Sequence, residues 1–132
     1  MNEGPQMQDG RTVLIIDDDP VHLQIYGWIL KSAGFVPFPA LVNSSGVDMP
    51  NGRVIDVVVL DYRLTGGMKA TDAARLVNVA YPDAPIILLS DVYGIPDDVA
   101  PYVKAFVRKG EPEKLIATVK KYAHPPDNPG GE

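Results

Sequence analysis

The chain has 132 residues and a mass of 14.3 kDa, the size of one domain with a single hydrophobic core. Its formal net charge of −5 argues against a dedicated nucleic-acid surface, and the lack of cysteine excludes disulfides and thiolate chemistry. No apolar run approaches the roughly 18 residues of a membrane span, and no signal sequence is recognised at the N-terminus. We therefore expect a cytoplasmic protein without direct contact to membrane or nucleic acid.

The first predicted element is a strand over residues 12–17, whose apolar run ends in three consecutive aspartates. The polar stretch before it, residues 1–10, is expected to be a flexible leader. Pro20 suits the first turn of a helix that Asp18 or Asp19 would cap. The stripe of this helix that is expected to face the core consists of His22, Ile25, Tyr26, Ile29, Leu30 and Ala33.

A second strand is predicted over residues 35–38, where two prolines favour a position at the edge of the sheet. The stretch 43–52 is rich in turn-forming residues, so any helix there is expected to be short or irregular. The third strand is predicted over residues 54–61 and contains the continuous apolar run Val57–Leu60. Such a run is typical of a strand buried on both faces, and here it ends in Asp61.

The second half of the chain continues the alternation of strands and helices. The elements expected there are a helix over 70–80, a strand over 86–89 followed by Ser90, a short helix opening near Asp97, a strand over 105–108 followed by Lys109, and a last helix over 112–123. Residues 124–132 contain too few apolar groups to pack and are expected to form a disordered tail. The alternation predicts an α/β domain over residues 11–123. Its sheet would be parallel, doubly wound and five-stranded, with the flavodoxin-like order 2-1-3-4-5.

In this order the carboxyl ends of the first and third strands meet where the direction of winding changes. Asp17, Asp18 and Asp61 should then lie together, with Ser90 and Lys109 on the neighbouring strands. Several carboxylates at one place either bind a hard cation or raise their own pKa values, and Mg²⁺ prefers such oxygen ligands. A carboxylate in this setting can act as a nucleophile toward a phosphoryl group, whose oxygens a hydroxyl and an ammonium can bind.

Four motifs in this order resemble a response-regulator receiver domain of two-component signalling. They are Val-Leu-Ile-Ile-Asp17-Asp18-Asp19-Pro20, Asp-Val-Val-Val-Leu-Asp61-Tyr-Arg-Leu, Pro-Ile-Ile-Leu-Leu-Ser90 and Ala-Phe106-Val-Arg-Lys109. The resemblance covers about residues 11–123 and is closest in kind to stand-alone receivers of the chemotaxis-regulator type. It implies a domain that catalyses only its own phosphorylation and dephosphorylation, and whose output is binding to another, unidentified protein.

The resemblance also implies roles for the acidic residues. Asp61 would accept a phosphoryl group from a histidine kinase or a histidine phosphotransfer protein. Asp17, Asp18, Asp61 and the main-chain carbonyl of Arg63 would hold Mg²⁺ or Mn²⁺.

Further roles follow from the later motifs. Ser90 and Lys109 would bind the phosphoryl group, and Ser90 together with Phe106 would form the switch. Ordinary strand packing is the alternative role of Phe106. Two residues depart from the family's pattern: Asp91 adds a negative charge where a small residue is usual, and Gly110 replaces the usual proline.

Two other interpretations remain open. Asp17-Asp18-Asp19-Pro20-Val21 also satisfies the Asp-x-Asp-x-Val motif of haloacid-dehalogenase-like phosphatases, in which Asp17 would be the nucleophile and Asp19 the general acid. The other interpretation is a receiver-like module that no longer takes phosphate and binds its partner constitutively. A separate hypothesis assigns Trp28, which lies off the apolar stripe of its helix, to contact with the kinase or phosphotransfer partner.

Overall fold

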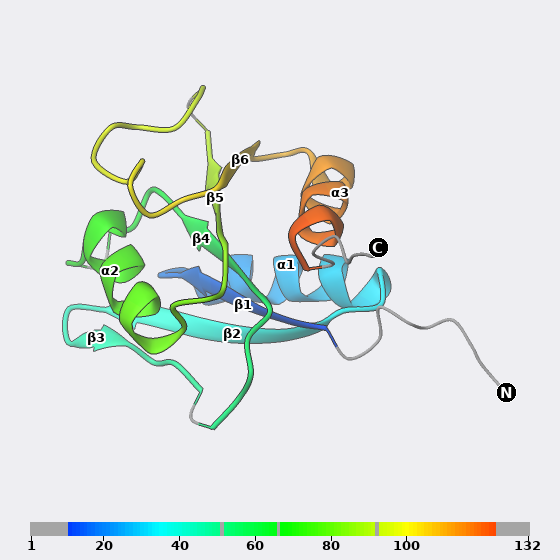
Figure 1. The fold of residues 1–132 in the computed structure, drawn as a ribbon, viewed down its shortest axis with the longest axis horizontal. Coiled ribbons are helices and arrows are strands. Elements are labelled where there is room, and N and C mark those ends of the chain that lie inside the picture. Colours follow the sequence, from blue (N-terminus) through cyan, green and yellow to red (C-terminus); the bar gives the residue numbers. More distant parts are fainter. Residues whose placement is uncertain (1–10, 51, 66, 92, 124–132) are drawn as a thin grey trace, which may run out of the picture.

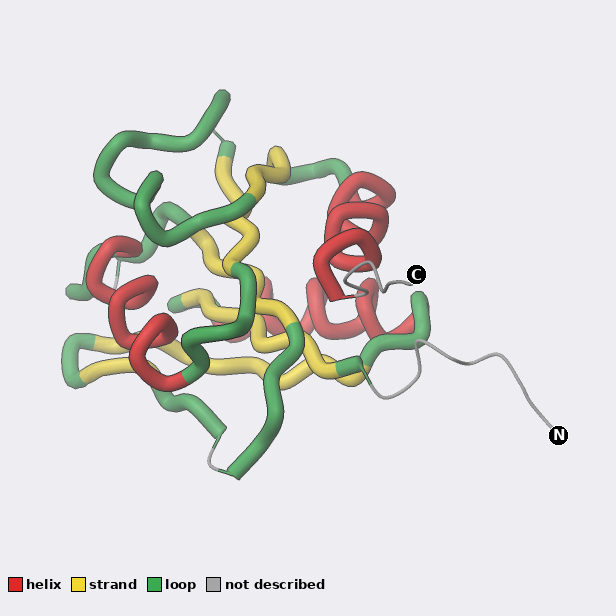
Figure 2. The backbone as a smooth tube through the Cα atoms, in the orientation of Figure 1, coloured by secondary structure: helices red, strands yellow, loops and turns green. Residues whose placement is uncertain are grey.

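A computed structural model of the chain describes residues 11–50, 52–65, 67–91 and 93–123. The leader and tail predicted at the two ends lie outside these residues. The elements in chain order are β1 (Thr12–Asp17), α1 (Pro20–Ser32), β2 (Val36–Asn43), β3 (Gly46–Val47), β4 (Val57–Asp61), α2 (Ala70–Ala80), β5 (Ile86–Ser90), β6 (Ala105–Arg108) and α3 (Pro112–Ala123). Figure 2 shows the strands gathered in the middle of the molecule, with helices on either side.

The strands form one sheet in the order β3-β2-β1-β4-β5-β6. Five of them are parallel, and β3 alone runs antiparallel to its neighbour β2. Without β3, the order of the parallel strands is the predicted 2-1-3-4-5. The predicted doubly wound α/β fold is therefore confirmed, and the sheet has one strand more than expected.

The extra strand, β3, lies in the stretch of turn-forming residues that follows β2. β2 continues to Asn43, well past the predicted end at residue 38, and the chain then turns back through Gly46 into β3. The Asn43 side chain accepts a hydrogen bond from the backbone N–H of Ser45 (2.8 Å), and Gly46 supplies a positive φ of 145°. Within the described part of this crossover the chain forms no helix, so the prediction of a short or irregular second helix is wrong. The turn-forming residues close a hairpin instead.

Two prolines lie inside β2 without disrupting its pairing with β1. The backbone N–H of Val36 donates to the carbonyl of Arg11 (2.9 Å), and N–H directions alternate along a strand. Pro37 and Pro39, whose nitrogens carry no hydrogen, therefore face away from β1. On that outer side, β3 pairs only with Val42–Asn43, so the prolines occupy the part of β2 that remains an edge.

The sheet is covered on both faces, by α2 on one side and by α1 and α3 on the other (Figure 1). Side chains alternate along each strand, so β1 contributes Leu14 and Ile16 to the α2 side and Val13 and Ile15 to the α1 and α3 side. All four are fully buried or nearly so. No helix in the described ranges combines the length and the apolar character needed to cross a membrane.

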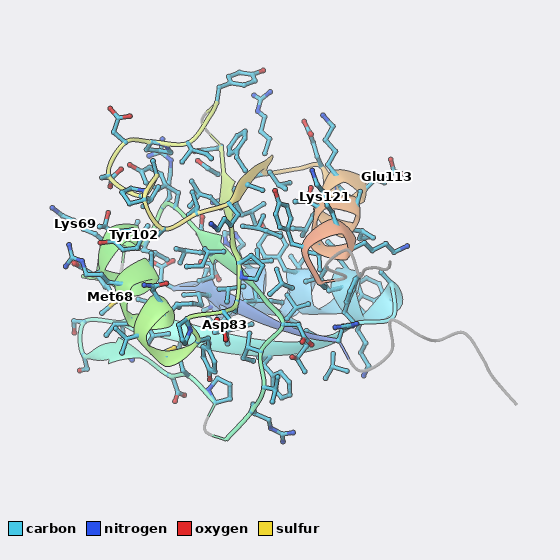
Figure 3. The ribbon with its side chains drawn as sticks, viewed as in Figure 1. Met68, Lys69, Asp83, Tyr102, Glu113 and Lys121 are labelled. Atoms are coloured by element: carbon cyan, nitrogen blue, oxygen red, sulfur yellow. The ribbon has the colours of Figure 1, made fainter. Side chains whose placement is uncertain are left out.

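The described residues between β5 and β6 form no helix near Asp97, so the short helix predicted there is wrong. Residues 97–102 form successive turns, in which the N–H of Tyr102 donates to the carbonyl of Val99 (2.9 Å). Figure 3 shows Tyr102 near α2, and its hydroxyl accepts a hydrogen bond from Nε of Arg75 on that helix (3.2 Å). These turns still place Val99 in the core, because burial of one side chain does not require a regular helix.

Candidate functional site

The candidate site lies at the carboxyl ends of the central strands. The register pairs Ile16 with Leu60, so Asp17 and Asp61 follow at the same level on the neighbouring strands β1 and β4. Because side chains alternate, both carboxylates continue the rows that face α1 and α3. Lys109 follows β6 and reaches the same place. The sequence thus predicted correctly that these three side chains from three strands would meet.

The carboxylates of Asp17 and Asp61 are both buried. Asp17 is 1% exposed and Asp61 is 2% exposed. The ammonium of Lys109 lies 2.9 Å from Oδ1 of Asp61, and the backbone N–H of Arg63 donates to the same oxygen (3.2 Å). Two buried carboxylates with one ammonium leave a net negative charge, which buried groups tolerate only with a further cation or a proton.

The pKa values show how the site carries this charge. Burial, and then repulsion by the Asp61 carboxylate, raise the pKa of Asp17 from 3.8 to about 7. Burial alone would lower the pKa of the Lys109 ammonium, but its hydrogen bond to Asp61 and the charge of that carboxylate outweigh burial and raise it. Asp17 therefore takes up a proton near neutral pH when no cation compensates its charge.

Asp18 is held by the loop that follows β4. Its Oδ2 accepts hydrogen bonds from the backbone N–H of Thr65 (2.5 Å) and from the Thr65 hydroxyl (2.7 Å). Burial opposes ionisation of Asp18, but these bonds outweigh it and lower the pKa of the carboxyl. Among the described residues, the side chains whose ligand atoms lie within 4.8 Å of one another are Asp17, Asp61 and His22. Asp18 lies outside this group.

His22 is the residue of this site that the sequence reasoning missed, since it assigned the side chain to an apolar stripe. Nδ1 of His22 lies 3.3 Å from Oδ2 of Asp17, and Nε2 lies 3.5 Å from Oδ2 of Asp19. Asp19 caps α1 by accepting a hydrogen bond from the N–H of Val21 (2.9 Å), which fixes His22 in the first turn. The sequence carries a signal for the contact between His22 and Asp19, because His22 follows the cap residue Asp19 by three positions and residues three apart on a helix share a face.

The remaining predicted residues lie around this centre. Ser90 is fully buried at the end of β5, and its carbonyl accepts a hydrogen bond from the N–H of Lys109 (2.8 Å). The side chain of Arg63 forms an ion pair with Asp91, with Nε 2.7 Å from Oδ1. Phe106 is half-buried on β6, opposite Leu88 of β5. The roles predicted for all of these site residues stay predictions, including those of the acidic residues and of Lys109.

Comparison with known sequences finds two bacterial regulators, and no protein-family model matches the chain. The transcriptional regulatory protein GlrR of Escherichia coli (strain K12) is 32% identical over 91 residues, which are 67% of this chain and 20% of that protein. The transcriptional regulatory protein QseF of Escherichia coli O157:H7 matches with the same values. The chain thus spans about one fifth of the length of these curated relatives.

Solved structures similar to the chain include receiver domains and response regulators. The chemotaxis protein CheY4 of Vibrio cholerae has a TM-score of 0.73 and 20% identity, over 86% of this chain and 98% of that chain. The response regulator TrrA of Thermotoga maritima has a TM-score of 0.70 and 23% identity, over 85% of this chain and 98% of that chain. Taken together, the fold and the sequence similarity are those of response-regulator receiver domains.

Proposed function

We propose that the chain is the phosphoacceptor domain of a two-component system, which takes a phosphoryl group onto Asp61 and thereby changes its binding to another protein. The observation that supports this most is the buried Asp61 carboxylate, 2.9 Å from the Lys109 ammonium and beside Asp17 at the carboxyl ends of the strands. An anionic phosphoryl group arriving there meets a fixed positive charge, which preorganises the site for its transfer.

The transfer would follow the chemistry of a carboxylate nucleophile. An oxygen of Asp61 attacks the phosphorus of a phosphohistidine on the donor, the P–N bond breaks, and the imidazole leaves and takes up a proton. The product is a mixed anhydride on Asp61. Lys109 would then pair with an oxygen of the phosphoryl group, and the Ser90 hydroxyl would donate a hydrogen bond to another. These new contacts of Lys109 and Ser90 to the phosphoryl group would favour the phosphorylated conformation over the unphosphorylated one. The side chain of Phe106 would change its rotamer along with Ser90.

The residues present suit Mg²⁺ or Mn²⁺ at this site. Their side chains supply hard carboxylate oxygens, and the raised pKa of Asp17 is consistent with two buried carboxylates that share the single ammonium of Lys109. We assign Asp17, Asp18, Asp61 and the main-chain carbonyl of Arg63 to hold the ion. When bound, it would neutralise charge on the phosphoryl oxygens during transfer. TrrA was solved in complex with Mg²⁺ and BeF, which supports this assignment by similarity.

The proposed donor is a histidine kinase or a histidine phosphotransfer protein, and the proposed place of action is the cytoplasm. The two relatives in the sequence comparison are named as transcriptional regulatory proteins, but this chain spans only 20% of each. With a net charge of −5, the chain itself fits a protein partner better than nucleic acid. Apart from its own phosphorylation and dephosphorylation, we propose no enzymatic activity.

The comparisons do not favour the phosphatase interpretation, and the site offers a further argument against it. Asp19, its candidate general acid, uses one carboxylate oxygen to cap α1 and turns the other toward His22. It is also 43% exposed, whereas a general acid is usually desolvated so that it stays protonated. The comparisons do not favour the other interpretation either, a module that takes no phosphate.

The test is incubation of the chain with acetyl phosphate and Mg²⁺, followed by intact-mass measurement. We expect one phosphoryl group on the wild type and none on Asp61→Asn. Asp83→Asn is the matched control and should leave the modification unchanged, because Asp83 precedes the amino end of β5 whereas the site lies at the carboxyl ends of the strands. No modification of the wild type would refute the proposal, and modification that persists in Asp61→Asn but is lost in Asp17→Asn would favour the phosphatase.

A further inference from the structure

We propose that His22 makes this acidic centre a binding site for transition-metal ions such as Co²⁺ and Zn²⁺, with the imidazole as a ligand beside Asp17 and Asp61. The inference rests on the cation site proposed above, but it does not depend on phosphoryl transfer. It adds a nitrogen ligand to a cation site for which the sequence predicted only oxygen ligands.

The donor atoms are close enough to share one ion. One atom each from Asp17, Asp61 and His22 lie within 4.8 Å of one another, and both carboxylates are nearly fully buried. Two carboxylate oxygens and one imidazole nitrogen are a ligand set that suits Zn²⁺, Co²⁺ and their neighbours in the first transition row. Mg²⁺ gains little from an imidazole, because it is a hard cation that prefers oxygen. The affinity for transition ions should therefore depend on His22 more than the affinity for Mg²⁺ does.

A second feature orients the imidazole as metal-binding histidines are oriented. Nδ1 faces the buried carboxylate of Asp17 (3.3 Å), while Nε2 lies 3.5 Å from Oδ2 of Asp19. A histidine that binds a metal through one nitrogen almost always presents its other N–H to a carboxylate or carbonyl, which fixes the ring and strengthens the ligand. Asp19 is itself fixed, because its Oδ1 caps α1 through Val21. This arrangement goes beyond a simple cluster of acidic side chains.

The consequence is a competition at the phosphoacceptor centre. A transition ion held by His22 would occupy the place that we assign to Mg²⁺, since both use Asp17 and Asp61. The charge beside the nucleophile would then depend on which ion is available. Phosphorylation of the chain would become sensitive to the concentration of transition metals.

Co²⁺ is the probe for the test, because its visible absorption reports both binding and the presence of a nitrogen ligand. The full chain, freed of metal, is titrated with Co²⁺ by absorption and with Co²⁺ and Mg²⁺ by calorimetry. For His22→Leu we expect Co²⁺ binding weakened about tenfold or more, with a changed absorption band, and Mg²⁺ binding within about twofold of the wild type. His124→Leu, which removes the chain's other histidine, is the matched control and should bind Co²⁺ like the wild type.

A second variant tests the orientation of the ring. Asp19→Asn keeps a residue that caps helices well but removes the charge facing Nε2, so it should weaken Co²⁺ binding to a smaller extent than His22→Leu. Unchanged Co²⁺ affinity in His22→Leu, or an equal loss of Co²⁺ and Mg²⁺ affinity, would overturn the inference. If Co²⁺ binding depends on His22 while acetyl phosphate leaves Asp61 unmodified, the proposed function fails and this inference stands. The reverse pattern overturns only the inference.

Discussion

Arg63 and Asp91 form an ion pair across the carboxyl ends of β4 and β5, with Nε of Arg63 2.7 Å from Oδ1 of Asp91. The hydrogen bond from Arg63 is the largest influence on Asp91 and lowers the pKa of this carboxyl, so the group stays ionised. Asp91 directly follows Ser90, where it adds a negative charge near the proposed phosphoryl site. The structure shows that Arg63 compensates part of that charge.

This pair predicts the effect of removing the extra charge. Asp91→Asn should be modified by acetyl phosphate several-fold faster than the wild type, because a negative charge near the site repels an anionic donor. The measurement is the initial rate of phosphorylation in Mg²⁺, at two ionic strengths, because added salt should reduce the difference. Asp97→Asn, which removes a charge from the turns before β6, serves as the control. An unchanged or slower rate in Asp91→Asn would show that Asp91 does not hinder the donor.

The raised pKa of Asp17 predicts how stability depends on pH. The folded chain keeps a proton on Asp17 up to about pH 7, whereas the unfolded chain releases it near the ordinary value of 3.8. The stabilising contribution of this proton is complete below pH 3.8 and is lost progressively as the pH rises from there to about 7. Without metal, the urea midpoint should therefore be higher near pH 5 than near pH 8, and Asp17→Asn should reduce that difference.

Metal binding should reverse this dependence, because Mg²⁺ binds the ionised carboxylates. Saturating Mg²⁺ should stabilise the chain more near pH 8 than near pH 5, and Asp17→Asn should remove most of that gain. A urea midpoint that is insensitive to both pH and Mg²⁺ would contradict the assignment of Asp17 to the cation site.

Two residues on α1 should differ sharply in their effect on stability. Trp28 is 74% exposed, whereas Leu30 is fully buried in the core between α1 and the sheet. Leu30→Ala should lower the free energy of unfolding by about 2–5 kcal/mol, and Trp28→Ala should change it by less than about 0.5 kcal/mol. Urea unfolding measures both. A strongly destabilised Trp28→Ala would argue against Trp28 as a contact for a phosphodonor, because the residue would then serve the fold.

The turn after Lys109 depends on Gly110, which has a φ of 87°. A side chain at this position meets no other atom but forces a residue into the left-handed region, so Gly110→Ala should destabilise the chain by about 1–2 kcal/mol. Gly27 is the matched control inside α1, where an added Cβ would lie 3.9 Å from Pro37. Gly27→Ala should stabilise the chain by about 0.5–1 kcal/mol. Thermal unfolding of both variants separates backbone strain from crowding, and equal effects of the same sign would contradict the prediction.

The sequence predicted the sheet because its strands are strongly marked. Val57–Leu60 is a continuous apolar run, and each of the strands that lead into the site ends in a polar residue such as Asp17, Asp61 or Ser90. Strand order then follows from the alternation of strands and helices. The hairpin after β2 could not be predicted, because turn-forming residues mark a change of direction without saying which partner the chain pairs with next.

The site was predicted in its strand positions but not in its side-chain partners. Asp17 and Asp61 follow from the register of β1 and β4. By contrast, Asp18 bonds to Thr65 in a loop, and loop contacts have no periodic pattern in sequence. The sequence assigned His22 to the core because helical spacing predicts only the face of α1 on which a residue lies. It does not predict that this face of the first turn lies next to Asp17 at the end of β1.

The most direct test of the account is to trap the proposed mixed anhydride chemically. The chain is phosphorylated with acetyl phosphate and Mg²⁺, reduced with borohydride, which converts an aspartyl phosphate to homoserine, and mapped by peptide mass spectrometry. The account predicts homoserine at position 61 and at no other aspartate. Homoserine at position 17, or none anywhere in a folded, Mg²⁺-binding protein, would contradict it.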